Sequence, residues 1–172
     1  MNSVEFLSNY AGGTIYGLHF KVKLDFDQST AGKTVITWTS YFMLDEANAS
    51  NYSAAAELYL EITPIKGTSS ATRIEAIPWK ENDGFYNFYT LDNKPFKSGT
   101  FTITHTENGE GTFGFVLNGN VGGYKKPFVY KDCGTITLDT NIPYTKCSAP
   151  TAITIDKTVQ KPGGNITFSW SG

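Results

Sequence analysis

A strict alternation of apolar and polar side chains in residues 14–26 constrains the fold of this chain more than any other feature. The apolar positions are Tyr16, Leu18, Phe20, Val22, Leu24 and Phe26, and the polar positions between them include His19, Lys21, Lys23 and Asp25. Successive side chains of a β-strand point to opposite faces of the sheet, whereas a helix repeats every 3.6 residues. The segment is therefore predicted to be a half-buried strand.

Further short apolar segments follow, separated by polar turns that are rich in Gly, Asn and Pro. We expect strands over residues 34–44, 57–63, 71–78, 85–91, 99–106, 112–117, 126–131 and 135–140, and a loop or one helical turn over residues 45–56. Apolar side chains occur on both faces of residues 34–44, which indicates a central or covered strand.

Local turn signals complete the pattern. Asn108-Gly109 is a strong hairpin signal, and residues 118–120 and 122–123 are expected to interrupt strands. No segment shows a sustained helical period. Many short strands with regular turns predict an all-β fold, namely an antiparallel two-sheet β-sandwich that is jelly-roll-like.

Composition agrees with this fold and excludes several functions. Aromatic residues make up 15% of the 172 residues, charged residues 17%, and the formal net charge is −2. Without a basic surplus we expect no nucleic-acid partner. No apolar run approaches the roughly 20 residues of a membrane helix, so we expect no membrane insertion. The first residues lack the basic and apolar regions of a signal peptide, which predicts a chain that is made in a cytosol and stays there, leaves by lysis, or was excised from something larger.

The end of the chain differs from what precedes it. We assign residues 1–145 to the β-sandwich domain and residues 146–172 to a linker followed by two strands, 151–155 and 166–170. These two strands are typical of the start of an immunoglobulin-like module. Since two strands cannot bury enough surface to be stable alone, we interpret them as a module cut short.

Residue types that carry catalysis or metal binding are isolated in the sequence. His19 lies on a polar strand face and His105 beside the expected hairpin, so we interpret both as structural. Cys133 and Cys147 do not form a CxxC pair and are expected to be free thiols. Residues 81–84 offer oxygen atoms to Ca²⁺ but lack the EF-hand pattern, which favours a plain turn. Neither a nucleophile signature nor a carboxylate pair is evident, so we expect no cofactor, no metal and no enzymatic activity.

Aromatic residues outside the expected core alternation allow two interpretations. They are Tyr41, Tyr52, Tyr59, Trp79, Tyr86, Phe88 and Tyr124. Outward aromatic rings can stack on sugars or anchor a protein interface; alternatively they pair across strands or are covered by a neighbouring domain. Trp79 is the strongest candidate, because it follows Pro78 in a polar turn. The residues that we expect in a carbohydrate-binding site are Trp79, Tyr86, Tyr52 and Asp83.

Three segments in order resemble an uncharacterised family of siphophage tail-tip and baseplate proteins. Residues 15–24 (IYGLHFKVKL) followed by residues 34–38 (TVITW) are similar to the opening of that family. Residues 99–109 (GTFTITHTENG) resemble its G-T-x-T-V-x-H-x-x-D-G hairpin, with Asn108 in place of Asp. Residues 134–143 (GTITLDTNIP) resemble its G-T-x-T-L-x-T-I-P-R exit, with Asn141 inserted and Tyr144 in place of Arg.

This resemblance implies a virion tail component that helps in host attachment, with immunoglobulin-like or other adhesive modules following. Its implied partners are other tail proteins and, through outward aromatics, a host cell-wall glycan; a homo-oligomer is left open. The family implies no catalytic residues. Two alternatives remain open: a purely structural virion assembly domain, and a carbohydrate-binding module of a bacterial surface protein or carbohydrate-active enzyme.

Overall fold

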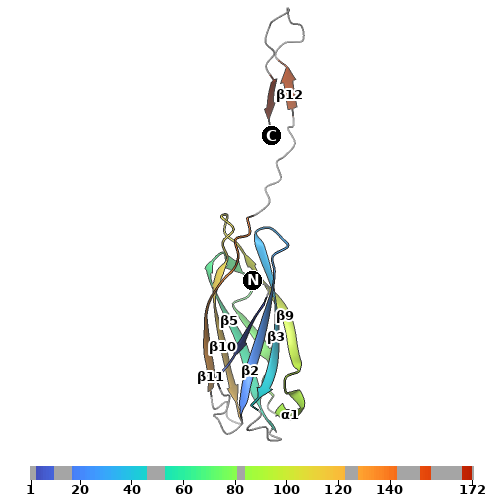
Figure 1. The fold of residues 1–172 in the computed structure, drawn as a ribbon, viewed down its shortest axis with the longest axis vertical. Coiled ribbons are helices and arrows are strands. Elements are labelled where there is room, and N and C mark those ends of the chain that lie inside the picture. Colours follow the sequence, from blue (N-terminus) through green and yellow to red (C-terminus); the bar gives the residue numbers. More distant parts are fainter. Residues whose placement is uncertain are drawn as a thin grey trace, which may run out of the picture.

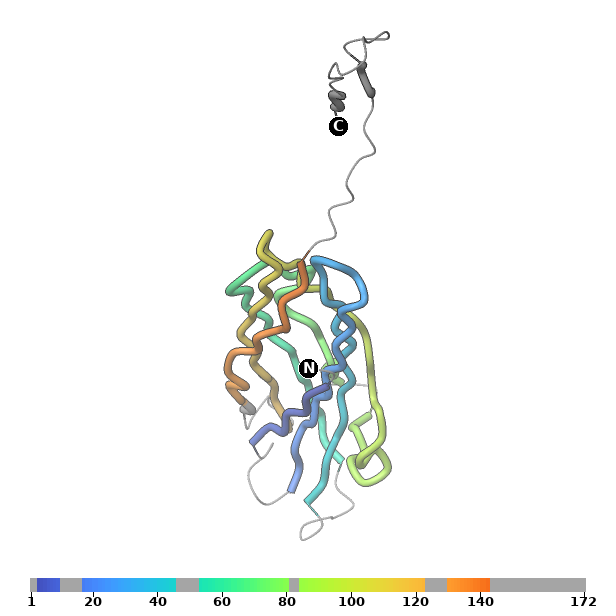
Figure 2. Tube along the Cα trace, turned by 45° about the horizontal axis from the view of Figure 1, so that its top comes forward, coloured from blue at the N-terminus to red at the C-terminus, as the bar shows by residue number. Residues whose placement is uncertain are grey.

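The main body of the described chain is formed by two larger antiparallel β-sheets that pack face to face (Figures 1 and 2). The computed structural model describes residues 3–9, 17–45, 53–80, 84–122, 128–142, 152–155 and 168–171. The first sheet has the spatial order β1 (Ser3–Leu7), β2 (Leu18–Asp27), β3 (Lys33–Leu44), β9 (Pro95–Thr104), β6 (Thr68–Ser69). The second has the order β11 (Phe128–Thr137), β10 (Thr112–Val121), β5 (Ala56–Lys66), β7 (Arg73–Ile77). The predicted all-β, two-sheet sandwich is confirmed.

Alternation along the strands builds the core between the sheets. The apolar face of β2 is fully buried from Leu18 to Leu24, as predicted, and β3 is central between β2 and β9. The second sheet contributes the inward side chains of β5 and β10, including Leu58, Leu60, Phe113 and Phe115, all at 0% exposure. Since full burial of one such side chain stabilises a fold by about 1.5–3 kcal/mol, this shared layer accounts for why the two sheets pack together.

The chain crosses between the sheets at several points. The hairpin of β5 and β7 lies in the second sheet, while the strands that precede and follow it, β3 and β9, pair with each other in the first. The β5–β7 hairpin is thus nested between two strands of the opposite sheet. Backbone carbonyls tie the sheet edges together: Lys97 Nζ donates to Glu75 O at 2.8 Å, and Asn9 Nδ2 donates to Tyr130 O at 3.3 Å.

The prediction of a hairpin at Asn108-Gly109 is wrong. The turn forms, with the Gly109 amide donating to the Thr106 carbonyl at 2.8 Å, but β9 and β10 on either side of it belong to different sheets. An Asn-Gly pair favours a reversal of the chain, and this reversal carries the chain across the sandwich instead of along one sheet.

The strand predicted over residues 85–91 is also wrong in its larger part. Only β8 (Tyr86–Asn87) is extended, pairing with β4 (Ser53–Ala54), and the chain then forms the helical turn α1 (Phe88–Leu91). The side chain of Asn87 accepts a hydrogen bond from the Thr90 amide at 3.0 Å, which is the N-cap interaction that starts a helix. The helical turn lies at one end of the sandwich (Figure 1).

Strand boundaries also differ from expectation elsewhere in the sandwich. Residues 118–120, expected to interrupt a strand, lie inside β10, which pairs with β5 and β11 on its two sides. Strand β5 continues through Pro64, since its pairing with β7 stops at Glu61 and leaves a free side that tolerates proline. The two strands predicted over 126–140 are one strand, β11, with a bulge at Cys133 and Gly134 (φ 77°).

The last described strands, β12 (Ala152–Ile155) and β13 (Phe168–Ser171), form an antiparallel pair. The presence of two strands in this part of the sequence is therefore confirmed. Their assignment to an immunoglobulin-like module, and the domain boundary at residue 145, stay predictions. The expected linker lies outside the described residues.

Candidate functional site

Tyr86, a predicted site residue, faces the core and not the surface. Only 3% of it is exposed, and its ring packs against those of Phe42 and Phe96 at centroid distances of 5.3 and 5.4 Å. The Tyr86 hydroxyl donates to the carbonyl of Pro78 at 2.6 Å. Burial, with a smaller effect of the Glu75 charge, raises the pKa of this hydroxyl. The outward orientation predicted for Tyr86 is thus wrong, and so is that of Phe88, which is fully buried.

The other predicted site residues fall near Tyr86 or outside the described residues. Trp79 is half-buried, directly after Pro78, and Lys80 Nζ lies 4.7 Å from the Tyr86 ring centroid. Tyr52 and Asp83 lie outside the described residues, as does Tyr124. Two aromatic residues that were not singled out, Phe85 and Tyr89, are 58% and 61% exposed beside β8 and α1. We call Trp79, Phe85 and Tyr89 the aromatic end of the sandwich.

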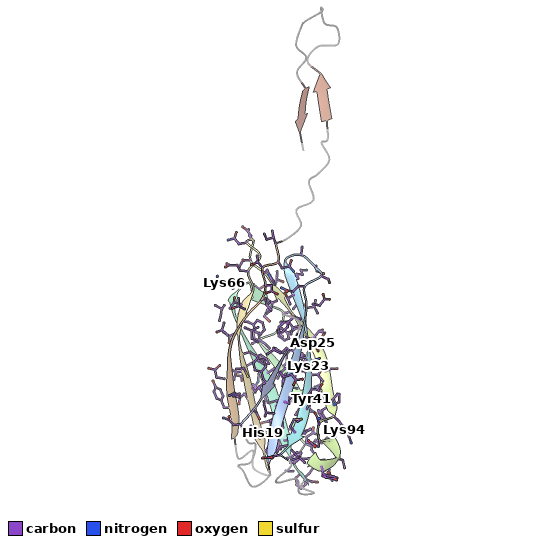
Figure 3. All side chains as sticks on the ribbon, in the orientation of Figure 1. His19, Lys23, Asp25, Tyr41, Lys66 and Lys94 are labelled. Atoms are coloured by element: carbon purple, nitrogen blue, oxygen red, sulfur yellow. The ribbon has the colours of Figure 1, made fainter. Side chains whose placement is uncertain are left out.

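Two lysines of β2 make contacts on the outer face of the first sheet. Tyr41 is half-buried there, and the ammonium group of Lys21 lies 4.4 Å from its ring centroid. Lys23 and Asp25 form an ion pair of 2.8 Å on the neighbouring strand β2 (Figure 3). The Tyr41 ring is therefore already engaged by a cation of this face.

The outer face of the second sheet has a different composition. Tyr59 of β5, Asn118 of β10 and Tyr130 of β11 lie directly opposite one another in adjacent strands. Side chains in such a row point to the same face, and two strand spacings separate the tyrosines by about 10 Å. Tyr130 is 48% exposed. This outer face, which we call the tyrosine–amide face, combines an exposed aromatic ring with an amide and a second tyrosine.

Two carboxylates fix the amides of this face. Asn118 Nδ2 donates to Glu61 Oε1 at 3.0 Å, and Asn120 Nδ2 donates to Glu57 Oε1 at 2.6 Å. Glu57 is only 5% exposed, and its second oxygen accepts a longer hydrogen bond of 3.4 Å from the Tyr59 hydroxyl. Each amide is therefore held in one orientation by a neighbouring strand.

The ring of Tyr59 is partly covered by a neighbouring side chain. The guanidinium of Arg73 lies 3.8 Å from the Tyr59 ring centroid and covers one side of the ring. Burial, followed by the negative charges of Glu57 and Glu75, raises the pKa of the Tyr59 hydroxyl, so the hydroxyl keeps its proton. Tyr130, which is 48% exposed, offers ring surface for stacking on a ligand, whereas Tyr59 is suited to hydrogen bonding.

One signal in the sequence could have pointed to this face. Asn and Gly are poor strand formers, yet Asn118-Gly119-Asn120 occupies a strand between two partners. Gly119 is required there, because a Cβ would lie 2.3 Å from the backbone oxygen of Glu57. Departures from local preference of this kind are expected at functional sites. Tyr130 itself carried no such signal.

The histidines and the described cysteine have structural surroundings. His105 is buried, with partners on both ring nitrogens: Thr34 Oγ1 at 2.7 Å and the Gly109 carbonyl at 2.6 Å. His19 Nδ1 lies 2.7 Å from the Ser8 carbonyl. Cys133 is a half-buried free thiol, and burial raises its pKa to about 11. The structural interpretation of His105 is confirmed. Cys147 lies outside the described residues.

The fold and the faces together define an antiparallel β-sandwich with one aromatic and amide-bearing outer surface. Among the described residues there is neither a ligand-sized pocket nor a group of three His, Cys, Asp or Glu side chains that could hold a metal ion. Within the same residues, no helix has the length and apolar character needed to cross a membrane. Neither the models of known protein families nor the curated proteins include a match to this chain.

Proposed function

We propose that this chain is a non-enzymatic carbohydrate-binding domain of a bacteriophage tail or baseplate, and that it contributes to host attachment. The observation that carries the binding part is the row of Tyr59, Asn118 and Tyr130 across the second sheet. Aromatic rings stack on the apolar faces of sugar rings, while amides and carboxylates bond sugar hydroxyls. A row with both kinds of group across three strands suits a polysaccharide lying across the strands.

The tail setting has separate support. Three segments that resemble the tail-tip and baseplate family occur in order over residues 15–143. In this proposal the domain resides in the virion tail, is made in the host cytoplasm, and contacts other tail proteins. The paired strands β12 and β13 then begin an immunoglobulin-like module.

The binding part is tested with the full chain and single substitutions. Tyr130→Ala should weaken binding to a retained glycan at least tenfold, or about 1.4 kcal/mol. Tyr89→Ala is the matched control, because Tyr89 is similarly exposed but lies on α1. A glycan array and cell-wall preparations from a panel of bacteria supply the ligands. Binding unaffected by Tyr130→Ala but lost in Tyr89→Ala or Trp79→Ala would move the site to the aromatic end.

The tail setting has its own experiment. An antibody raised against the chain should label one end of the tail of purified virions in electron microscopy. Virions that contain the protein only in the capsid, or that lack it, would contradict this part of the proposal and leave the binding part standing. In the latter case the chain would be a carbohydrate-binding module of a bacterial surface protein or carbohydrate-active enzyme.

A second candidate function is structural assembly within the virion. It is favoured by the exposure of Phe85 and Tyr89 at 58% and 61%, since large exposed apolar side chains mark protein interfaces. Light scattering coupled to size exclusion tests it: assembly predicts an oligomer at high concentration that Phe85→Ser with Tyr89→Ser dissociates. A monomer at all concentrations argues against self-assembly through this end.

A further inference from the structure

We infer that the glycan recognised by the tyrosine–amide face is one that presents hydrogen-bond donors, with protonated amino sugars bound more tightly than N-acetylated ones and acidic sugars excluded. The inference rests on the proposed function and adds the chemical class of its ligand. It comes from the orientation of the amides and from the charges that surround them.

Hydrogen bonds to neighbouring carboxylates fix the orientation of the two amides. A carboxylate can only accept hydrogen bonds, so the Asn118 and Asn120 groups beside Glu61 and Glu57 must turn their NH₂ ends toward them. Their carbonyl oxygens therefore point away from the carboxylates. The Tyr59 hydroxyl likewise directs its proton to Glu57 and leaves its lone pairs available. One N–H of each amide and the Tyr59 hydroxyl proton are thus used within the protein, and the amide carbonyl oxygens remain as acceptors for a ligand.

The charge of the face adds to this preference. The outward positions of the row and its neighbours include four carboxylates and one guanidinium, namely Glu57, Glu61, Glu75, Asp132 and Arg73. The Arg73 guanidinium is engaged over the Tyr59 ring. Only 5% of Glu57 is exposed. A ligand with phosphate or carboxylate groups meets like charge here, which costs affinity. An ammonium group meets opposite charge and strong acceptors.

Stacking and charge make separable contributions at two residues. Tyr130, 48% exposed, would contribute ring contact to any sugar. Glu61 holds Asn118 in its orientation and supplies negative charge. If Glu61 is replaced by Gln, the new amide can donate to Asn118, so the amide of Asn118 is free to turn and one charge is lost. Tyr130 thus controls whether a sugar binds, and Glu61 controls which sugar is preferred.

The experiment compares oligosaccharides of glucosamine, N-acetylglucosamine and galacturonate of equal length by titration calorimetry with the full chain. The pH is set so that the glucosamine amines are protonated. Charge-assisted hydrogen bonds exceed neutral ones by about 1 kcal/mol, so glucosamine should bind roughly fivefold tighter than N-acetylglucosamine. Galacturonate should not bind detectably. Added salt should reduce the preference, because it screens charge.

Substitutions make the outcomes distinguishable. Glu61→Gln should remove most of the preference for glucosamine. Glu110→Gln is the control and should keep the preference, because the Glu110 carboxylate pairs with Lys66 away from this face. Galacturonate bound as well as glucosamine, with both lost in Tyr130→Ala, would overturn the inference and leave the proposed function standing. The same holds if no oligosaccharide binds while cell-wall binding still depends on Tyr130. If Tyr130→Ala binds every ligand like the wild type, the inference and the proposed site both fail.

Discussion

His105, which directly follows β9, and Thr34 of β3 are joined by a buried hydrogen bond of 2.7 Å between the imidazole Nε2 and the hydroxyl Oγ1. The other ring nitrogen lies 2.6 Å from the Gly109 carbonyl, which can only accept, so Nδ1 carries a proton. In the neutral ring Nε2 therefore accepts from Thr34. A single side chain thus ties the start of β3 to the turn that follows β9.

We predict that His105→Ala lowers the free energy of unfolding by about 2–4 kcal/mol, because it removes two hydrogen bonds and takes this partner from the buried Thr34 hydroxyl, while the Gly109 carbonyl keeps the Asn141 amide. Urea denaturation measures the change. His19→Ala is the control: His19 is half-buried on the outer face of β2 and should cost less. An equal loss in the two variants would contradict the structural role assigned to the His105 network.

The side chain of Asn141 is expected to stabilise the end of the described sandwich through hydrogen bonds to the backbone. Its Nδ2 lies 2.9–3.1 Å from the carbonyls of Gln28, Thr30 and Lys33, and its Oδ1 accepts from the Gly32 amide at 3.0 Å. Asn141→Ala should lower the melting temperature by several degrees, equivalent to about 1–3 kcal/mol. Asn108→Ser, in an exposed turn, should be nearly neutral. A neutral Asn141→Ala would show that water replaces these bonds at little cost.

Alanine substitution at two glycines of β10 should change the free energy of unfolding by very different amounts. A Cβ at Gly119 would lie 2.3 Å from the Glu57 backbone oxygen, whereas at Gly114 the nearest atom is Thr63 Cβ at 3.7 Å. Gly119→Ala must separate β5 from β10, so we expect a loss of more than about 2 kcal/mol and loss of glycan binding. Gly114→Ala should change stability by less than about 1 kcal/mol. Chemical denaturation followed by tryptophan fluorescence tests both; similar effects would contradict the close strand contact at Gly119.

The Cys133 thiol should react slowly with iodoacetamide at neutral pH. Burial raises its pKa from 9.0 to about 11, and only the thiolate is nucleophilic. Alkylation of a Cys147→Ser protein should accelerate between pH 9 and about 11, while the urea-unfolded chain reacts as an ordinary thiol. Because the folded state favours the protonated thiol, its contribution to stability is complete below pH 9 and is lost as the pH rises through about 11. Rapid modification of the folded protein at pH 8 would contradict this environment.

The sequence was most informative where alternation was strong. One-sided alternation in residues 18–26 left a single choice of buried face, and the structure agrees. Around Tyr86 and Phe88 both faces are apolar or aromatic, so the choice of buried face could not be made from the pattern. The helical turn there depends on the Asn87 cap, a local hydrogen bond that strand propensity does not report.

Sheet membership and the tyrosine–amide face needed tertiary information. The Asn108-Gly109 signal specifies a reversal but not the sheet that receives the next strand. Asn118 and Asn120 look like turn residues until the pairing of β10 with β5 and β11 places them beside Glu61, Glu57 and Tyr130. Such a row is assembled from three separate strands, and β5 lies far from the other two in sequence, so periodicity within each strand cannot reveal it.

The turn at Asn108-Gly109 has a consequence for how the chain folds during synthesis. The turn sends β10 to the opposite sheet. Strand β3 gains its second neighbour only when β9 has been made, and β5 gains its second neighbour only when β10 has been made, long after each has left the ribosome. Two long apolar strands therefore keep an open edge until the later strands emerge, and open edges template aggregation. Folding is expected to be slow and late, with the second half of the chain acting as the closure for both sheets.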